Sequence, residues 1–165
     1  KNGKGYQEIQ SQSCTVNLSS YIEMIVLVVL LIINYLIYSN LKPNQKLVEV
    51  REKYKTLREY LIETDNRDFE EIYHEIPLVA YERMSSSVGY NTNKGQEIGI
   101  CLDGDVNEIF HVLLHELAHC VVDEYTHSKE YWNNFKELRD ICVKLGIYQE
   151  IPKRTEFCGK HVQDK

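Results

Sequence analysis

Several patterns that would define a function are missing from this sequence of 165 residues. Its five cysteines include no C-x-x-C pair, so neither a zinc ribbon nor a thioredoxin-like redox pair is expected. There is no surplus of basic residues either: 25 acidic against 19 basic residues give a formal net charge of −6, which disfavours dedicated binding of DNA or RNA. No internal repeat is apparent, and the length leaves room for one globular domain and a tail.

The cysteines are odd in number and widely spaced, which favours reduced thiols over a disulfide framework. Cys120 lies inside an apolar helical run, where a free cysteine usually behaves as a small buried hydrophobic residue. Reduced thiols also agree with a cytosolic location of the domain. The five positions are Cys14, Cys101, Cys120, Cys142 and Cys158.

One long hydrophobic run is present, residues 21–39, and only Glu23 and Asn34 interrupt it with strongly polar side chains. A helix of about 18 residues is about 27 Å long, enough for the hydrocarbon core of a membrane, and tyrosines near both ends suit its interfaces. A domain this small would not cover a helix that is apolar on every face. No small-x-small cleavage site follows the run, so it predicts a single transmembrane helix and not a signal peptide.

The segments around this run are polar. Residues 1–20 predict a flexible tail, and residues 40–45 form a short linker. The basic residues that closely follow the run are Lys42, Lys46, Arg51, Lys53, Lys55 and Arg58, whereas only Lys1 and Lys4 precede it. The positive-inside rule therefore predicts a single-pass membrane protein whose C-terminal domain is cytosolic. A short span with Asn34 inside it suits a thin membrane, such as that of the endoplasmic reticulum.

Residues 46–165 are expected to form one mixed α+β domain. Three helices are predicted, the first of them amphipathic because its apolar residues recur at steps of three and four: Lys46–Leu61, Val106 to about Tyr125, and Lys129 to about Leu145. A small antiparallel sheet is expected between Arg83 and Leu102, with a turn at residues 93–95 whose residue types tolerate positive φ. Gly146 would end the last helix.

The second of these helices contains the letters HELAH. On a helix, His115 and His119 are offset by only about 40° and lie about 6 Å apart along the axis, so both imidazoles can reach one metal ion. Glu116 is rotated from His115 by about 100°, a position from which it can act as a general base. The neighbouring residues are apolar, and buried polar groups in such surroundings need a partner. The pattern therefore predicts a catalytic Zn²⁺ site.

A catalytic zinc ordinarily takes three protein ligands and leaves a fourth position for water. His127 is the preferred third ligand, and Glu124 and Asp123 are the alternatives. An unbroken helix would place His127 about 12 Å along the axis from His119, too far to share the ion. The helix is therefore expected to end near Tyr125 and to turn back.

The other histidines are not predicted to bind the metal. His111 lies four residues before His115, but three histidines on one straight helix cannot all converge on one ion. We therefore interpret His111 as a surface or helix-entry residue. His74 and His161 have no ligand-like surroundings and are interpreted as structural or exposed.

The spacing of HELAH, a histidine after seven residues, and a Tyr-Trp pair resembles the WLM family of zinc metallopeptidases, which is related to the SprT-like proteases. The resemblance is strongest to small membrane-anchored WLM proteins of large DNA viruses, which implies that the thin membrane is the host endoplasmic reticulum or an internal membrane of a virion. It covers roughly residues 46–165, including the ICLD sequence that ends the strand pair and the later EFCGK sequence. The positions that match the family's pattern are His115, Glu116, His119, His127, Tyr131 and Trp132.

This resemblance implies a zincin-like metallopeptidase domain that hydrolyses peptide bonds in a protein or peptide substrate. The implied zinc ligands are His115, His119 and His127. Glu116 would act as the general base toward a zinc-activated water. A tyrosine could stabilise the oxyanion, and Tyr125 and Tyr131 are both close enough in the sequence.

The sequence offers two alternative functions. A non-catalytic structural or interaction protein of a viral or cellular membrane would not need Glu116, and structural zinc usually has four protein ligands. The wider family also suggests a role in clearing proteins crosslinked to DNA. Without the 3 basic and 2 acidic residues before position 46, the totals of 19 and 25 leave 16 basic and 23 acidic residues, so nucleic acid is not expected as a partner.

Overall fold

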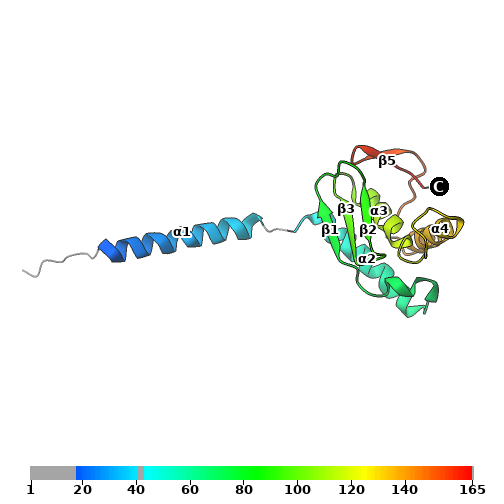
Figure 1. The fold of residues 1–165 in the computed structure, drawn as a ribbon, viewed down its shortest axis with the longest axis horizontal. Helices are drawn as coiled ribbons and strands as arrows, with labels where there is room; N and C mark the ends of the chain where they lie inside the picture. Colours follow the sequence, from blue (N-terminus) through cyan, green and yellow to red (C-terminus); the bar gives the residue numbers. More distant parts are fainter. Residues whose placement is uncertain (1–17, 41–42, 165) are drawn as a thin grey trace, which may run out of the picture. The chain divides into compact units, whose positions relative to one another are not determined.

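The computed structural model describes residues 18–40 and 43–164, in two units that meet after residue 42. Residues 1–17 of the expected tail and residues 41–42 of the expected linker lie outside the described residues. The first unit contains one helix, α1 (Leu18–Asn40), which is slightly longer than the predicted span (Figure 1). The second unit contains all the other helices and strands and is described below by itself.

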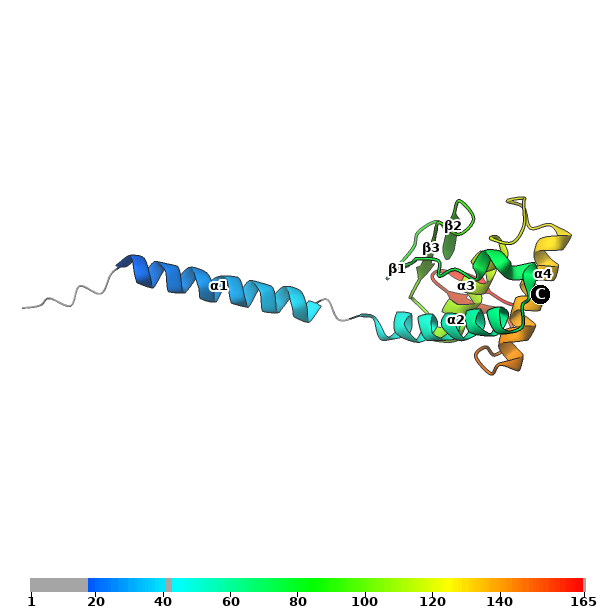
Figure 2. The same ribbon diagram turned by 90° about the horizontal axis from the view of Figure 1, so that it is seen from below.

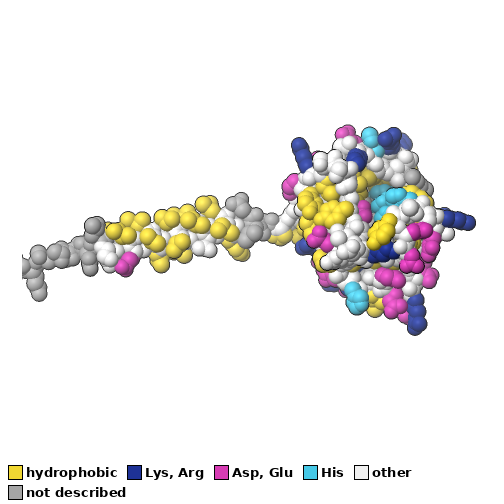
Figure 3. Space-filling view, in the orientation of Figure 1, with side chains coloured by type: hydrophobic (Ala, Val, Ile, Leu, Met, Phe, Trp, Pro, Cys, Tyr) yellow, Lys and Arg dark blue, Asp and Glu magenta, His cyan; other side chains and the backbone are white. Residues whose placement is uncertain are grey.

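Helix α1 is apolar along its length and exposed. Residues 19–39 have a mean hydropathy of 2.3, and none of this stretch is buried (Figure 3). The polar side chains inside it bond within the helix: Asn34 Nδ2 donates to the Leu30 carbonyl at 2.9 Å, and Ser39 Oγ donates to the Leu36 carbonyl at 2.9 Å. By length and composition, α1 is therefore able to cross a membrane.

The second unit begins with α2 (Gln45–Glu63), the amphipathic helix that the apolar spacing predicts. Its first turn is capped by the Asn44 side chain, which accepts a hydrogen bond from the Lys46 N–H at 2.9 Å. The buried stripe is the predicted one, Val50, Tyr54, Leu57 and Leu61. The acidic segment that follows forms a 3₁₀ helix, η1 (Arg67–Ile72), whose apolar residues are buried.

A three-stranded sheet follows, with strands β1 (Leu78–Tyr81), β2 (Gly89–Thr92) and β3 (Glu97–Cys101) in the order β1-β3-β2. Strands β2 and β3 form the predicted antiparallel hairpin, and Asn93, Lys94 and Gly95 adopt positive φ in its turn. The antiparallel pairing predicted for residues 83–102 is thus confirmed, but the sheet as a whole is mixed, because β1, which lies before this range, pairs with β3 in parallel. The paired residues of β1 and β3 are about 20 positions apart, and a parallel pair needs a crossover connection between its strands. The alternation of apolar and polar residues within each strand does not reveal such a pairing.

Helix α3 (Val106–Ala118) is the central element of the second unit. It contacts β2 and β3 of the sheet, and it also packs against α2 and α4 (Figures 1 and 2). Asp105 and Glu108 form a capping box at its start, in which the Asp105 N–H donates to the Glu108 carboxylate at 2.7 Å. The helix ends at Ala118 and not near Tyr125 as predicted. This earlier end allows the chain to return toward α3.

The last helix, α4 (Lys129–Lys144), agrees with the prediction. Ser128 caps its first turn by accepting a hydrogen bond from the Tyr131 N–H at 3.1 Å, and Gly146, with φ of 71°, ends it. A short hairpin of β4 (Thr155–Phe157) and β5 (Lys160–Val162) follows, which was not predicted because each strand has only three residues. Strand β5 lies against α3.

A disulfide joins Cys101, at the end of β3, to Cys158, in the turn of the C-terminal hairpin. The expectation of reduced thiols is therefore wrong for these two residues. Their partnership spans 57 residues and depends on the fold that places the hairpin beside β3, so spacing alone did not indicate it. Cys120 and Cys142 are free and buried, in agreement with the prediction for Cys120.

The disulfide is expected to contribute to stability. We expect Cys158→Ser to lower the free energy of unfolding by about 2–4 kcal/mol, because a crosslink over a long loop restricts the unfolded chain. The measurement is denaturant unfolding of the full chain in detergent, with and without a dithiol reductant. The difference between wild type and variant should vanish in reductant. Equal stability without reductant, in a sample whose disulfide is verified by non-reducing peptide mapping, would contradict the prediction.

Candidate metal centre

Three histidine side chains converge at the C-terminal end of α3. The His127 Nε2 atom lies 3.0 Å from His115 Nε2 and 3.2 Å from His119 Nε2. His115 and His119 come from consecutive turns of the helix, with His119 as its C-cap, and His127 comes from the loop before α4. Among the described residues, this is the group whose nitrogen, sulfur or carboxylate atoms could hold a metal ion (Figure 3).

The loop between α3 and α4 brings His127 back to the helix. Cys120 N–H bonds to the Leu117 carbonyl at 2.9 Å, which tightens the chain just after α3. Lys94, from the β2–β3 turn, donates to the carbonyl of Val122 at 2.7 Å and to that of Asp123. The carbonyls of Val122 and Asp123 therefore have a hydrogen-bond partner without a further helical turn. This bonding stabilises the loop in which the chain reverses direction before His127.

The spacing of the nitrogens suits zinc. With Zn–N bonds of about 2.0–2.1 Å in a tetrahedral site, two ligand nitrogens lie about 3.3 Å apart, close to the 3.0 and 3.2 Å found here. The ligand atoms of all three histidines lie within 4.8 Å of one another. A neutral imidazole has one donor and one acceptor nitrogen, so a shared cation would satisfy the acceptor nitrogens of the group. Burial, and then repulsion from His127, lower the pKa of His119, which favours the neutral form that binds metal.

Aromatic side chains of α4 support the three histidines. The Tyr131 ring lies 4.4 Å from the His119 ring and 4.6 Å from the His127 ring, centroid to centroid. Its hydroxyl donates to the His115 backbone carbonyl at 3.2 Å. The Trp132 ring lies 5.5 Å from the His127 ring. Tyr131 and Trp132, the aromatic pair that matches the family's pattern, therefore border the site, and Tyr131 is buried beneath it.

Glu116 lies beside the histidines and is buried, with 7% of the residue exposed. Burial raises its pKa from 4.5 to about 7, because desolvation disfavours the carboxylate. A group with a pKa near neutrality can accept and return a proton at neutral pH. The arrangement thus combines a site for a cation with an adjacent proton acceptor.

Two residues of β2, which sequence reasoning did not single out, shape the surroundings of Glu116. A Cβ atom on Gly89 would lie 2.6 Å from Val112 Cγ1 and 3.0 Å from Glu116 Oε1, so glycine lets the strand pass this close. Asn91 Nδ2 donates to the Glu116 backbone carbonyl at 2.8 Å. In the sequence, the signal for this close approach was Gly89 itself, because a glycine in a strand often marks a place where another element packs closely against the backbone.

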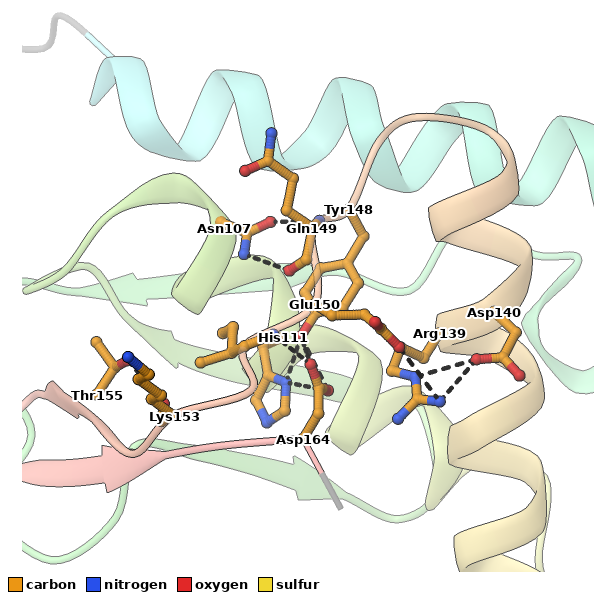
Figure 4. A network of polar contacts seen from close by, with 11 residues as sticks. Asn107, His111, Arg139, Asp140, Tyr148, Gln149, Glu150, Lys153, Thr155 and Asp164 are labelled. Carbon is orange, nitrogen blue, oxygen red and sulfur yellow. Dashed lines mark hydrogen bonds and ion pairs between the residues drawn. The ribbon is translucent and has the colours of Figure 1, made fainter.

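The structure corrects the interpretation of His111, which is buried in a polar network (Figure 4). Its Nδ1 atom lies 2.9 Å from the Tyr148 hydroxyl and 3.3 Å from Asp164 Oδ1. Asp164 also accepts hydrogen bonds from the Tyr148 hydroxyl and the Ile151 N–H. Burial raises the pKa of Asp164, but these hydrogen bonds, led by that from His111, bring it below its ordinary value. His111 therefore binds the C-terminal segment one turn before His115.

The remaining predicted candidates lie outside the histidine group. Asp123 and Glu124, the alternative ligands, are exposed and do not belong to it. Tyr125 is 73% exposed and lines a cavity together with Glu116 and His119. His74 and His161 are exposed, as predicted, and His161 lines a second cavity that also contains His115 and Glu116.

The fold and the site define a class of protein. A helix with two histidines one turn apart and a glutamate between them, a third histidine from a chain reversal, and a small sheet beside the helix are features of a zincin-like metalloprotease. The chain belongs to the WLM-domain family, since the WLM domain matches residues 56–164. The resemblance inferred from the motif is thereby confirmed, and the family implies a metal, zinc.

Similar proteins occur in viruses. The chain is 32% identical over 94 residues to an uncharacterised protein of Acanthamoeba polyphaga mimivirus, which is 50% of this chain and 48% of that protein. It is 44% identical over 55 residues to an uncharacterised protein of Invertebrate iridescent virus 6, which is 33% of this chain and 31% of that protein. The chain thus spans about half the length of the first relative and about a third of the second.

Two similar solved structures are those of Wss1 from Saccharomyces cerevisiae and of a mutant of it. The first has a TM-score of 0.48 and 22% identity, and the alignment covers 64% of this chain and 84% of that one. The second has a TM-score of 0.47 and 21% identity, with 66% and 90% covered.

The raised pKa of Glu116 predicts a pH-dependent stability of the metal-free protein. Between the ordinary pKa of 4.5 and the raised value of about 7, the folded chain holds a proton that the unfolded chain has released, so the free energy of unfolding falls as pH rises through this range. In excess chelator we expect Glu116→Gln to be more stable than wild type by about 2–3 kcal/mol at pH 8, and by much less near pH 5. Denaturant unfolding across this range measures the difference.

The matched control is Glu156→Gln, which removes an exposed carboxylate on β4. Its stability should follow the wild-type pH profile. Zinc should reduce the advantage of Glu116→Gln, because a nearby cation favours the charged carboxylate. Parallel profiles for wild type and Glu116→Gln in chelator would show that Glu116 titrates normally.

Proposed function

We propose that this protein is a membrane-anchored zinc metallopeptidase that hydrolyses peptide bonds in a protein or peptide substrate. The observation that carries the proposal is a group of three histidines whose ligand atoms lie within 4.8 Å of one another, together with a buried glutamate that lines the same cavities. A structural zinc site usually has four protein ligands and no buried proton acceptor next to it. Three ligands leave room for water and substrate.

In this proposal His115, His119 and His127 hold the ion through Nε2. Zinc, when bound, supplies Lewis acidity, which lowers the pKa of water and polarises the peptide carbonyl. Glu116 accepts a proton from a water molecule as the water oxygen bonds to the carbonyl carbon. As the C–N bond breaks, Glu116 gives this proton to the leaving nitrogen, which regenerates the carboxylate.

The aromatic residues keep this arrangement in place. The hydroxyl of Tyr131 is bonded to the His115 carbonyl, so Tyr131 orients the helix end and its ring supports two imidazoles. Tyr125 is exposed in the cavity beside Glu116, where a substrate could meet its hydroxyl. Between the two tyrosines, we therefore propose Tyr125 as the candidate for contact with an oxyanion.

Metal content and activity test the proposal together. We expect one zinc per full chain purified in detergent, sharply reduced in His127→Ala. Asp123→Ala and Glu124→Ala, which remove the alternative ligands, should keep zinc and serve as matched controls. Glu116→Gln should keep zinc but lose about 10²–10⁴-fold in kcat/KM on an unstructured protein substrate, because the proton acceptor is removed. Elemental analysis and a cleavage assay supply the two readouts.

The opposite outcomes are informative. Full zinc binding in His127→Ala would exclude His127 as a required ligand. Zinc binding without cleavage of unstructured proteins or peptides by the wild type would support a non-catalytic protein with a retained metal site. Cleavage that persists in Glu116→Gln would exclude the proposed base.

We further propose that α1 is a single membrane span. Its exposed apolar side chains and internally bonded polar groups support this. The flanking basic residues predict a cytosolic domain, although four of them also bond to backbone carbonyls of the domain: Lys46, Arg51, Lys53 and Arg58. The Cys101–Cys158 disulfide suits an oxidising compartment and thus predicts the opposite side.

Protease protection decides between these two orientations. We retain the charge-based orientation and expect the domain, made in the presence of microsomes, to resist carbonate extraction but to be digested by added protease. A chain lacking residues 18–40 should remain in the supernatant and is the control for anchoring. Protection of the domain until detergent is added would place it in the lumen, where the disulfide is favoured.

A further inference from the structure

Two cavities flank Glu116, and it lines both of them. One has a volume of about 390 Å³ and lies between Trp132 and the C-terminal strand β5. The other has a volume of about 190 Å³ and is lined by Lys94 and Tyr125. Glu116 is the residue common to both linings, and the three histidines are divided between them, His115 and His127 in the first and His119 in the second. We refer to the two cavities together as the cleft, and we take it as the path of an extended peptide whose scissile bond lies beside Glu116.

The larger cavity is apolar on its inner side. Its volume is large enough for a bulky aliphatic or aromatic side chain, which would lose contact with water on entering. Its apolar lining residues are Val88, Val112, Trp132, Phe135 and Val162.

The rim of this cavity is cationic. Lys160 of β5 lines it, and the Lys160 amine donates to the Ser86 carbonyl, in the segment that supplies the opposite wall. Lys94 lines the smaller cavity. Among the described residues that line the two cavities, Glu116 is the one acidic side chain, although residues 46–165 contain 23 acidic and 16 basic residues. The cleft therefore has the opposite charge balance to the domain around it.

Strand β5 is fixed at both ends, so Lys160 is held in position. Cys158, two residues before it, is joined to β3 by the disulfide. Asp164, two residues after β5, has a side chain that is 7% exposed and bonded to His111 and Tyr148 (Figure 4). The backbone of Lys160 is thereby held at the cavity, and its amine is kept there by the hydrogen bond to the Ser86 carbonyl.

We propose that the cleft selects peptides with a bulky apolar residue next to an acidic one, with the apolar side chain in the larger cavity and the carboxylate beside Lys160. The inference deepens the proposed peptidase function and rests on it. Lys160 is then a specificity-determining residue supplied by the C-terminal hairpin. The net negative charge of the domain disfavours binding of acidic peptides at the rest of its surface, whereas the lysines of the cleft favour it. This contrast increases the preference of acidic peptides for the cleft.

The test uses three peptides that contain Phe and no Trp and differ only in an Asp, Asn or Lys beside the Phe. Trp132 is the single tryptophan of the chain and lines the cavity, so its fluorescence reports binding. Affinities are measured on the zinc-loaded full chain with Glu116→Gln, in neutral detergent, and kcat/KM is measured on the chain with Glu116 intact. We expect the Asp peptide to bind about fivefold more tightly than the Lys peptide.

Lys160→Glu should abolish or invert the ratio of the affinities for the Asp and Lys peptides. Lys160→Gln, which keeps a donor for the Ser86 carbonyl, should bring this ratio near one. Lys153→Glu is the matched control: the same charge change at an exposed residue of the same segment, outside the cavity lining, should leave the ratio unchanged. The inference would be overturned by an affinity ratio that stays unchanged in both Lys160 variants. It would also be overturned if the Glu116→Gln chain with Lys160 intact bound all three peptides equally.

Binding and cleavage together separate the two proposals. Selective binding without cleavage by zinc-loaded wild type would support the cleft preference and overturn the peptidase function. Cleavage without preference would support the peptidase function and overturn the cleft preference. Absence of both binding and cleavage would overturn both.

Discussion

The geometry of the candidate metal site constrains the rest of this fold. Two histidines one helical turn apart can share an ion, but a third ligand needs a chain reversal immediately after the helix. Helix α3 ends at Ala118, and the loop returns with Lys94 bonded to its carbonyls and Ser128 capping the next helix. Helix α4 then brings Tyr131 under the imidazoles. The sheet contributes to this centre as well, because the hairpin turn places Lys94 where it can hold the loop.

The parts of the fold that depend on local periodicity could be predicted from the sequence. The apolar stripe of α2, the β2–β3 turn and the ends of α4 all follow from spacing and cap residues within a few positions. The end of α3 could not be predicted in this way, because the apolar residues continue through Val122 and no glycine or proline marks the stop. The interaction that stabilises the reversal comes from Lys94, 28 residues away.

Long-range partners also explain the two corrected residues near the site. His111 fits a surface position by sequence, because its partners Tyr148 and Asp164 are 37 and 53 positions further on. The pairing of Cys101 with Cys158 depends in the same way on a C-terminal hairpin too short to be recognised from alternation. For the site, the motif indicated the residues that the structure brings together, but neither Gly89 nor the cavity walls could be read from it.

The C-terminal segment, residues 160–164, contributes directly to the wall of the larger cavity. Asp164 loses water on folding, and the hydrogen bonds from His111 and Tyr148 compensate only when the segment lies along α3. The same placement brings Val162 and Lys160 to the cavity beside His115 and Glu116. The region that matches the WLM domain ends at residue 164, and so includes this carboxylate. Because one helix carries both His111 and His115, loosening the segment would disturb the cleft wall and the helix that bears the candidate ligands together.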